Sequence, residues 1–386
     1  MIIHEYQTKK IFSSVGIPVL KGKVAYTPNE ALTIAQNIGG ESWYVKAQVL
    51  SSGRALGKFL EEEAGSGSGL QVADGGRAVP EIAGKMLLHH LLTQNEINEV
   101  KKVYIEEKID IVQAFDFEIC VDFVRERVLF KGTDLKKKKK EVCYELSLDK
   151  KLSLMKSLAL VAKVGVPKGF MREASATLRA MFDLFKKYNA FSVEVKPLVI
   201  TSDKRLVALD GKIYFDPDAV SKHKEIQVLR DFEMETANQK KARDNNFRYI
   251  PMDGNIGCII NGSGLSMGTL DLIVRKGGRP SCLLDLGGTP TKEMVSDAVK
   301  IILSEPDTEG LLVNIFGANA RCDIIADGLV AAAKEISSGM PIVVRMDGTN
   351  ASVGERLLFE SGLPFIVKQK MTDAVSSIVE EVEAIR

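Results

Sequence analysis

The second half of the chain carries the pattern that most constrains its fold. From Asn255 onward, short apolar runs alternate with amphipathic segments long enough to be helices. In the segment after the second run, the apolar positions between 294 and 302 follow the period of a helix. The apolar runs lie at 256–260, 282–286, 311–316, 341–346 and 365–367. Strand–helix units of this kind predict an α/β fold, in which a doubly wound parallel sheet has helices on both faces.

The loops that follow these strands predict where a ligand binds. Doubly wound sheets bind their ligands outside the carboxyl ends of the strands. A glycine pair after one strand is common in any α/β fold, so the segment 262–264 alone is a weak sign of a phosphate-binding turn. Polar, glycine-containing loops follow four of the strands, at 261–264, 287–291, 317–321 and 347–350. Because the four loops are expected at the same edge of the sheet, together they favour a ligand site at that edge.

The first part of the chain is less regular and predicts an α+β arrangement. One helix is expected from His4 to about Ser14, and the segment 27–30 has the N-cap, proline and acid order that opens another. A strand is expected over 43–49, with Lys46 at its centre. A strand lysine that faces a cleft can neutralise phosphates, whereas one that faces solvent is an ordinary surface residue. Spacing alone leaves both interpretations open.

Two further features of this part are candidates for a charged site. The segment 51–58 either closes over a nucleotide or is an ordinary hairpin loop. Two strands are expected on either side of the polar turn at 201–205, paired with each other. This pairing places Glu194, Lys196 and Asp210 near one another.

Composition excludes several classes of protein. Hydrophobic residues make up 45% and charged residues 27% of the 386 residues, which is typical of a globular protein and not of a disordered or collagenous one. No apolar run reaches the length of a transmembrane helix, and the first residues lack the pattern of a secretory signal. The 5 cysteines lie far apart and are odd in number, which argues against a disulfide framework or a zinc site and favours a reducing cytoplasm.

The charge distribution argues against nucleic acid as a partner. Residues 251–386 carry 12 Lys and Arg against 18 Asp and Glu, whereas residues 1–250 carry 40 against 33. A mildly basic first part suits a phosphorylated small molecule but is too weakly charged for nucleic acid. The densest basic run, at 136–140, has no interleaved aromatic residues and is expected to be a solvated turn.

A set of longer motifs gives the chain a family resemblance over its whole length. The motifs are His4 to Gln7, the strand around Lys46, Glu194 to Ile200, Ala208 to Lys212, Asp253 to Cys258, Val313 to Gly317 and Arg321 to Asp323. In order and spacing they make the sequence similar to the β subunits of succinate–CoA ligase, also called succinyl-CoA synthetase. The resemblance implies an ATP-grasp nucleotide-binding domain of two subdomains over residues 1–240 and a flavodoxin-like CoA-ligase domain over residues 250–386.

The resemblance also implies an activity and a partner. Succinate, CoA and a nucleoside triphosphate, ATP or GTP, would give succinyl-CoA, the diphosphate and phosphate, with Mg²⁺ at the nucleotide. An α subunit, in an αβ or α2β2 assembly, would carry CoA and a phosphorylated histidine. Phosphate would pass from the nucleotide to that histidine and then to the acid, and CoA would attack the acyl phosphate. Neither a nucleic acid nor a membrane is expected as a partner.

By resemblance, the site residues divide into four groups. Glu194 would face the phosphohistidine of the partner, where a carboxylate can orient the imidazole. Asp210 would be a magnesium ligand. The nucleotide would be contacted by Lys46 at its phosphates, by Glu106 near the adenine, and by the closing loop of Gly53, Arg54 and Ala55. The acid would be contacted by Asn261, Ala318, Asn319 and Ala320.

The chain departs from the family pattern at several of these positions. Lys196 stands where the family has a magnesium-binding asparagine, and a protonated lysine has no acceptor with which to ligate a cation. Ala114 stands at the position of a carboxylate used for the ribose, and Ile109 at that of a nearby polar contact. Ala55 stands at a glycine position of the closing loop.

Three interpretations of function follow. The first is a working ligase subunit that acts on succinate. The second is the same chemistry on another small acid, malate-like or sulfonated, because Asn319 adds polarity to the acid loop. The third is a degenerate, non-catalytic ATP-grasp subunit kept for assembly or regulation. The residues that favour the first two are Lys46, Glu106, Glu194 and Asp210. Lys196 and Ala114 favour the third.

Overall fold

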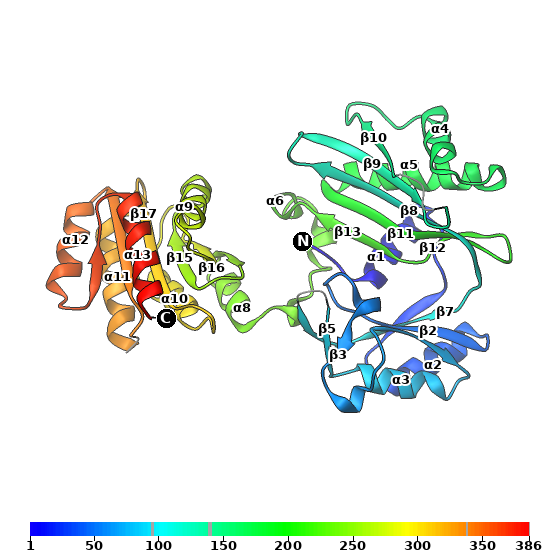
Figure 1. Ribbon diagram of the computed structural model, residues 1–386, viewed down its shortest axis with the longest axis horizontal. Helices are drawn as coiled ribbons and strands as arrows, with labels where there is room; N and C mark the ends of the chain where they lie inside the picture. Colours follow the sequence, from blue (N-terminus) through cyan, green and yellow to red (C-terminus); the bar gives the residue numbers. More distant parts are fainter. Residues whose placement is uncertain (94–95, 138–140, 337–338, 386) are drawn as a thin grey trace. The chain divides into compact units, whose positions relative to one another are not determined.

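The chain forms two compact units, Met1–Arg230 and Asp231–Arg386. They are seen in a computed structural model that describes residues 1–93, 96–137, 141–336 and 339–385 (Figure 1). Among these residues, no helix is long and apolar enough to cross a membrane. Of the basic run expected to be a solvated turn, 136 and 137 lie in an exposed turn, and 138–140 lie outside the described residues.

The first unit begins with an antiparallel sheet that has two helices on one face. The helices are α2 (Pro28–Ile38) and α3 (Ala78–Met86), and the strand order is β1 (Gly22–Ala25), β7 (Val103–Glu107), β2 (Ser42–Ala47) and β4 (Leu70–Asp74). Thr27 caps α2 as the sequence predicts, because its side chain accepts a hydrogen bond from the Glu30 backbone N–H at 3.2 Å.

A larger sheet forms the other half of the first unit. Its strand order is β10 (Val142–Leu146), β9 (Arg127–Asp134), β8 (Ile111–Asp122), β11 (Ala190–Thr201) and β12 (Leu206–Ala208), and β13 (Gly211–Phe215) also pairs with β11. Helices α4 (Leu154–Val164) and α5 (Met171–Lys187) cover one face, where Phe115 and Phe117 of β8 are fully buried. Because strand residues alternate between faces, Asp116 and Glu118 lie on the opposite, uncovered face.

Smaller elements complete the first unit and lead into the second. Helix α1 (Glu5–Ser14) begins as the sequence predicts, within one residue. The remaining elements are η1 (Arg54–Leu56), β3 (Lys58–Phe59), η2 (Glu62–Ala64), β5 (His90–Leu92), β6 (Ile97–Glu99), η3 (Lys168–Phe170), α6 (Pro217–Val220), α7 (Lys224–Gln227), η4 (Phe232–Met234) and α8 (Ala237–Asp244).

The second unit confirms the predicted doubly wound parallel sheet. Helices α9 (Ser263–Arg275) and α13 (Met371–Ile385) pack on one face, and α10 (Lys292–Leu303), α11 (Cys322–Glu335) and α12 (Ala351–Glu360) on the other. The strand order is β14 (Arg248–Pro251), β16 (Pro280–Asp285), β15 (Ile256–Ile260), β17 (Gly310–Gly317), β18 (Ile342–Gly348) and β19 (Phe365–Val367). β15 to β19 are the predicted strands, whereas the antiparallel edge strand β14 was not predicted.

Candidate functional site

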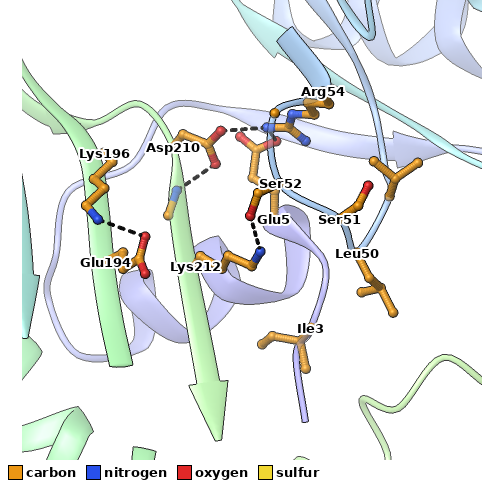
Figure 2. Close-up of a pocket in the computed structure, with 13 residues that line it drawn as sticks. Ile3, Glu5, Leu50, Ser51, Ser52, Arg54, Glu194, Lys196, Asp210 and Lys212 are labelled. Carbon is orange, nitrogen blue, oxygen red and sulfur yellow. Dashed lines mark hydrogen bonds and ion pairs between the residues drawn. The ribbon is translucent and has the colours of Figure 1, made fainter. Parts of the chain in front are cut away.

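A polar pocket in the first unit gathers several of the residues that the sequence singles out. Its volume is about 280 Å³, and it lies between the loop after β2, the start of α1, and strands β11 and β13. Its charged lining consists of the carboxylates Glu5, Glu194 and Asp210 and the cations Arg54, Lys196 and Lys212 (Figure 2). A second pocket of about 350 Å³ shares Leu50, Ser51, Ser52 and Lys212 with the first. Together they give the room that small-molecule ligands need.

The polar side chains of the pocket come from the uncovered face of the larger sheet. Glu194 of β11 lies opposite Glu118 of β8 on one side and opposite Lys212 of β13 on the other. Lys131 of β9 lies opposite Glu118, so one row of charges crosses four strands. Since the other face of the same strands is the apolar core, the period of two along each strand fixes which charged side chains meet.

Lys196 is held between two carboxylates. Its Nζ lies 2.7 Å from Glu118 Oε2 and 3.2 Å from Glu194 Oε2. Burial lowers the pKa of Lys196, but the hydrogen bond from its ammonium to Glu118 and the charge of Glu194 outweigh burial and raise it. Burial likewise opposes ionisation of Glu118, and its bond with Lys196 outweighs this, so the pKa of Glu118 is lowered. Both groups are therefore charged at neutral pH.

A buried cluster of ion pairs adjoins the pocket through Glu5, which belongs to both. Lys46 is only 1% exposed, which excludes a surface lysine, and its Nζ lies 2.9 Å from Glu5 Oε1 and 2.7 Å from Glu106 Oε2. Lys9 is also ion-paired with both carboxylates. Burial raises the pKa of Glu5, but the cations around it outweigh burial and hold its pKa well below its ordinary value. Lys46 and Glu106 are not among the residues that line the pocket, and Lys46 contacts it through Glu5.

The segment 51–58 is anchored to the site by Arg54. The guanidinium of Arg54 is ion-paired with Glu5, lies 2.8 Å from Asp210 Oδ2 and donates to the backbone oxygen of Ala47. Gly53, just before it, has φ 85°, a left-handed conformation that favours glycine. Ala55 lies in η1 and has no positive φ, so an alanine is compatible with the backbone there.

Lys212 differs from the other cations of the pocket. Its Nζ donates to Ser52 Oγ at 2.8 Å, and in the described part of the chain no carboxylate lies within ion-pair distance of it. Burial lowers the pKa of Lys212, which reflects a charge that is incompletely compensated. An anion placed between Lys212 and the serines of the loop after β2 would compensate it.

The donor set of the pocket does not fit a magnesium ion. Asp210 is turned toward Arg54 in Figure 2, and its other oxygen accepts from the Gly211 backbone N–H at 2.7 Å. Glu194 is paired with Lys196, and Lys196 itself has no acceptor. Over the described residues, no group of three or more His, Cys, Asp and Glu side chains is arranged to hold a metal ion.

The loops at the carboxyl edge of the second unit's sheet are joined by hydrogen bonds. The side chain of Asn261 donates to the backbone oxygen of Phe316 and accepts from its N–H, both at 2.8 Å. Asp285 Oδ1 accepts from the N–H groups of Gly262 and Gly287 at 2.8 and 2.9 Å. The four predicted loops thus share one edge, but the Asn261 amide is already occupied by backbone groups.

The predicted acid loop divides into exposed and buried residues. Ala318 and Asn319 are exposed, and the Ala318 backbone oxygen accepts from Thr349 Oγ1 at 3.0 Å. Ala320 is 1% exposed and packs in the hydrophobic core. Of these residues, only Ala318 and Asn319 present their side chains to solvent at this edge.

The sequence reasoning missed four residues of the first unit's site. Glu5 and Lys9 face each other one turn apart on α1, and this spacing is visible in the sequence. The contact of Glu5 with Lys46 is not visible there. Glu118 and Lys212 lie on the same face as Glu194, and the period of two along β8 and β13 could have identified them once the strand pairing was known.

Comparisons with known proteins agree with this organisation. Residues 2–200 match the ATP-grasp domain family, and residues 259–379 match the CoA-ligase family. The succinate–CoA ligase [ADP-forming] subunit beta of Paramagnetospirillum magneticum is 38% identical and that of Rhodospirillum rubrum 37%, each with 99% of both chains covered. The protein of the same name from Burkholderia lata is 37% identical, with 98% of both chains covered.

The solved structures support the fold. ATP citrate lyase from Methanothrix soehngenii, in complex with citrate and coenzyme A, aligns with a TM-score of 0.66 over 98% of this chain and 99% of that chain. Its sequence identity is 15%, so the likeness concerns the fold alone. The sequence relatives extend over almost the full length, and both domain families match. The chain therefore belongs to the family of succinate–CoA ligase β subunits, and it is a subunit of a ligase that joins an acid to CoA.

Proposed function

We propose that this chain supplies phosphate from a bound nucleotide for the ligation of succinate to CoA, in a complex with an α subunit. One ATP, one succinate and one CoA give succinyl-CoA, ADP and phosphate. The names of the relatives support succinate as the acid and ADP as the nucleotide product. The 5 cysteines are free, which supports a reducing compartment such as the cytoplasm.

The observation that carries the proposal is a cationic pocket next to a carboxylate. Arg54, Lys196 and Lys212 line the same pocket as Glu194. Three cations in one pocket suit the phosphates of a nucleotide, because hydrogen bonds between charged groups are among the stronger ones in proteins. A partly exposed carboxylate beside them can orient an incoming imidazole.

Each residue of the first unit would have a distinct role. Gly53 and Arg54 would contact the phosphates directly, with Ala55 in the same loop. Lys46, which is paired with Glu106, would act indirectly, because it holds Glu5 and through it Arg54. Glu194 would face the phosphohistidine of the α subunit.

The second unit would take up the acid and meet the α subunit, which carries CoA. We propose residues 1–240 as the nucleotide-binding domain and residues 250–386 as the CoA-ligase domain. The loop with Ala318 and Asn319 would contact the acid, while Asn261 and Ala320 would keep that loop in shape through their backbone and core contacts.

A reconstituted enzyme tests the proposal. The full chain and a purified succinate–CoA ligase α subunit are incubated with ATP, CoA and one acid at a time, and ADP and the CoA thioester are measured. Succinate should give the highest kcat/KM, and the isolated chain should give no thioester because it carries no phosphohistidine. A higher kcat/KM with a malate-like or sulfonated acid would overturn succinate as the substrate. Robust ligation by the isolated chain would overturn the need for a partner.

A further inference from the structure

The ammonium of Lys196 occupies a position that a bridging cation would take. Its two partners, Glu118 and Glu194, lie directly opposite each other on neighbouring strands. Their side chains are 17% and 25% exposed, and that of Lys196 is 37% exposed. Two carboxylates that converge on one point from adjacent strands are the kind of oxygen pair that a hard divalent cation uses. Here a lysine fills that point.

The remaining carboxylates of the pocket are also paired. Asp210 faces Arg54 at 2.8 Å, and Glu5 faces Arg54 and Lys46. The charged lining as a whole consists of three carboxylates and three cations. A divalent cation would have to displace one of these cations or bind beside it against like-charge repulsion.

We infer that Lys196, held by Glu118 and Glu194, is the built-in cation of this pocket and takes the place of a divalent ion on the chain's own carboxylates. The nucleotide part of this inference rests on the proposed function. An ammonium has three N–H donors, and two point to the carboxylates, which leaves one for a phosphate oxygen. Glu118 does not line the pocket, so it is a positioning residue that acts through Lys196.

Metal binding to the full chain without nucleotide gives the first test. The affinity for Mn²⁺, used as a spectroscopic probe for Mg²⁺, is measured by electron paramagnetic resonance for the natural chain and for Lys196→Asn. The variant frees Glu118 and Glu194, so it should bind Mn²⁺ about tenfold more tightly or better than the natural chain. Equal affinities would overturn the inference, whether both chains bind the ion or neither does.

Lys131→Asn is the matched control. Lys131 also faces Glu118, at 3.7 Å, and is 32% exposed, but it does not line the pocket. Its removal should leave the Mn²⁺ affinity within about threefold of the natural value, because the Lys196 ammonium stays in place. An increase as large as that of Lys196→Asn would show a general charge effect and overturn the specific role of Lys196. Denaturation midpoints check that each variant is folded, and Lys196→Gln repeats the comparison with a longer side chain.

Nucleotide binding gives the second test. Calorimetry measures the Kd of ADP in EDTA and in Mg²⁺. For the natural chain the two values should agree within about threefold, and for Lys196→Asn binding should become about tenfold tighter with Mg²⁺ than with EDTA. A natural chain that needs Mg²⁺ for ADP overturns the inference and leaves the proposed function standing. A natural chain that binds no ADP in either buffer overturns the proposed function, while the Mn²⁺ comparison still decides the inference.

A double-mutant cycle tests the positioning role of Glu118. Glu118→Gln should weaken ADP binding in EDTA about threefold or more in the natural chain. In the Lys196→Asn chain the same change should have no effect, because the lysine that it positions is gone. An equal loss in both chains would indicate a merely structural contribution and overturn the positioning role.

Discussion

Glu5 is the residue on which the support of the pocket depends most. Its carboxylate is 4% exposed and is ion-paired with Lys9, Lys46 and Arg54. A buried charge without its partners is costly, because the interior does not replace the water that it has lost. The ion pairs of Glu5 therefore position Arg54 and stabilise the packing of helix α1.

We expect Glu5→Gln to destabilise the chain by about 3–5 kcal/mol, the range for breaking a buried ion pair from one side. Chemical denaturation of the full chain measures the change in unfolding free energy. Glu81→Gln is the control, since Glu81 pairs with Lys85 at the surface, where both side chains are about half exposed or more. That change should cost about 1 kcal/mol or less. Equal effects of the two substitutions would contradict the central position of Glu5.

The pH dependence of the same variant gives an independent check. Because the pKa of Glu5 is lowered in the folded chain, its contribution to stability is present above the ordinary glutamate pKa of about 4.3. The contribution is lost as the pH falls through the lowered value. The difference in unfolding free energy between the natural chain and Glu5→Gln should thus be constant near neutral pH and shrink below about pH 4. A difference in unfolding free energy that grows on acidification would contradict a lowered pKa of Glu5 in the folded chain.

At the level of elements, the ends of β17 and β18 are locked together by a close backbone approach. Gly348 has φ 90°, and a Cβ on it would lie 2.1 Å from the backbone oxygen of Gly317. The same oxygen accepts a hydrogen bond from the Thr349 N–H at 2.7 Å. This contact fixes the loop that carries Ala318 and Asn319.

We predict that Gly348→Ala destabilises the chain by about 3 kcal/mol or more, since it adds a backbone clash to the cost of a left-handed alanine. Gly362→Ala is the matched control, because Gly362 has φ 69° but nothing within 4 Å of the added Cβ. It should cost about 1–2 kcal/mol. Urea denaturation measures the unfolding free energy of both variants. Equal losses would mean that the contact with Gly317 contributes nothing.

Helices and strands can be predicted from the sequence where a regular pattern of apolar residues extends over the whole element. The core strands of the second unit are mostly apolar, and Thr291 caps α10, its side chain accepting from the Met294 N–H. β14 was not predicted because it has four residues, is partly exposed and ends at Pro251, so its alternation is weak. The pairing of β11 with β12 was predicted because the turn between them is short and polar.

The site was predictable only where its residues lie close in sequence or share a motif. Glu194, Lys196 and Asp210 were expected near one another, and all three line one pocket. The contact of Lys46 with Glu5 joins residues 41 positions apart, and that of Lys196 with Glu118 joins residues 78 apart. Such pairs depend on how the elements pack, which local spacing does not determine.

At the scale of the whole molecule, the chain has two units with separate cores, and we propose a different ligand for each. The cations of the first unit's pocket are proposed to bind a nucleotide, and the exposed loop of Ala318 and Asn319 in the second unit is proposed to contact the acid. In the proposed function, a carrier takes the phosphate from the nucleotide to the acid, and this carrier is the histidine of an α subunit.

Transfer of labelled phosphate from ATP to an α subunit tests this account most directly. The full chain is mixed with a succinate–CoA ligase α subunit and ATP labelled at the γ-phosphate, without succinate or CoA, and the subunits are separated. We predict an acid-labile label on the α subunit that requires this chain and that is lost when ADP is added in excess. If this chain binds ATP and the α subunit, and the α subunit still carries no label, the account is contradicted.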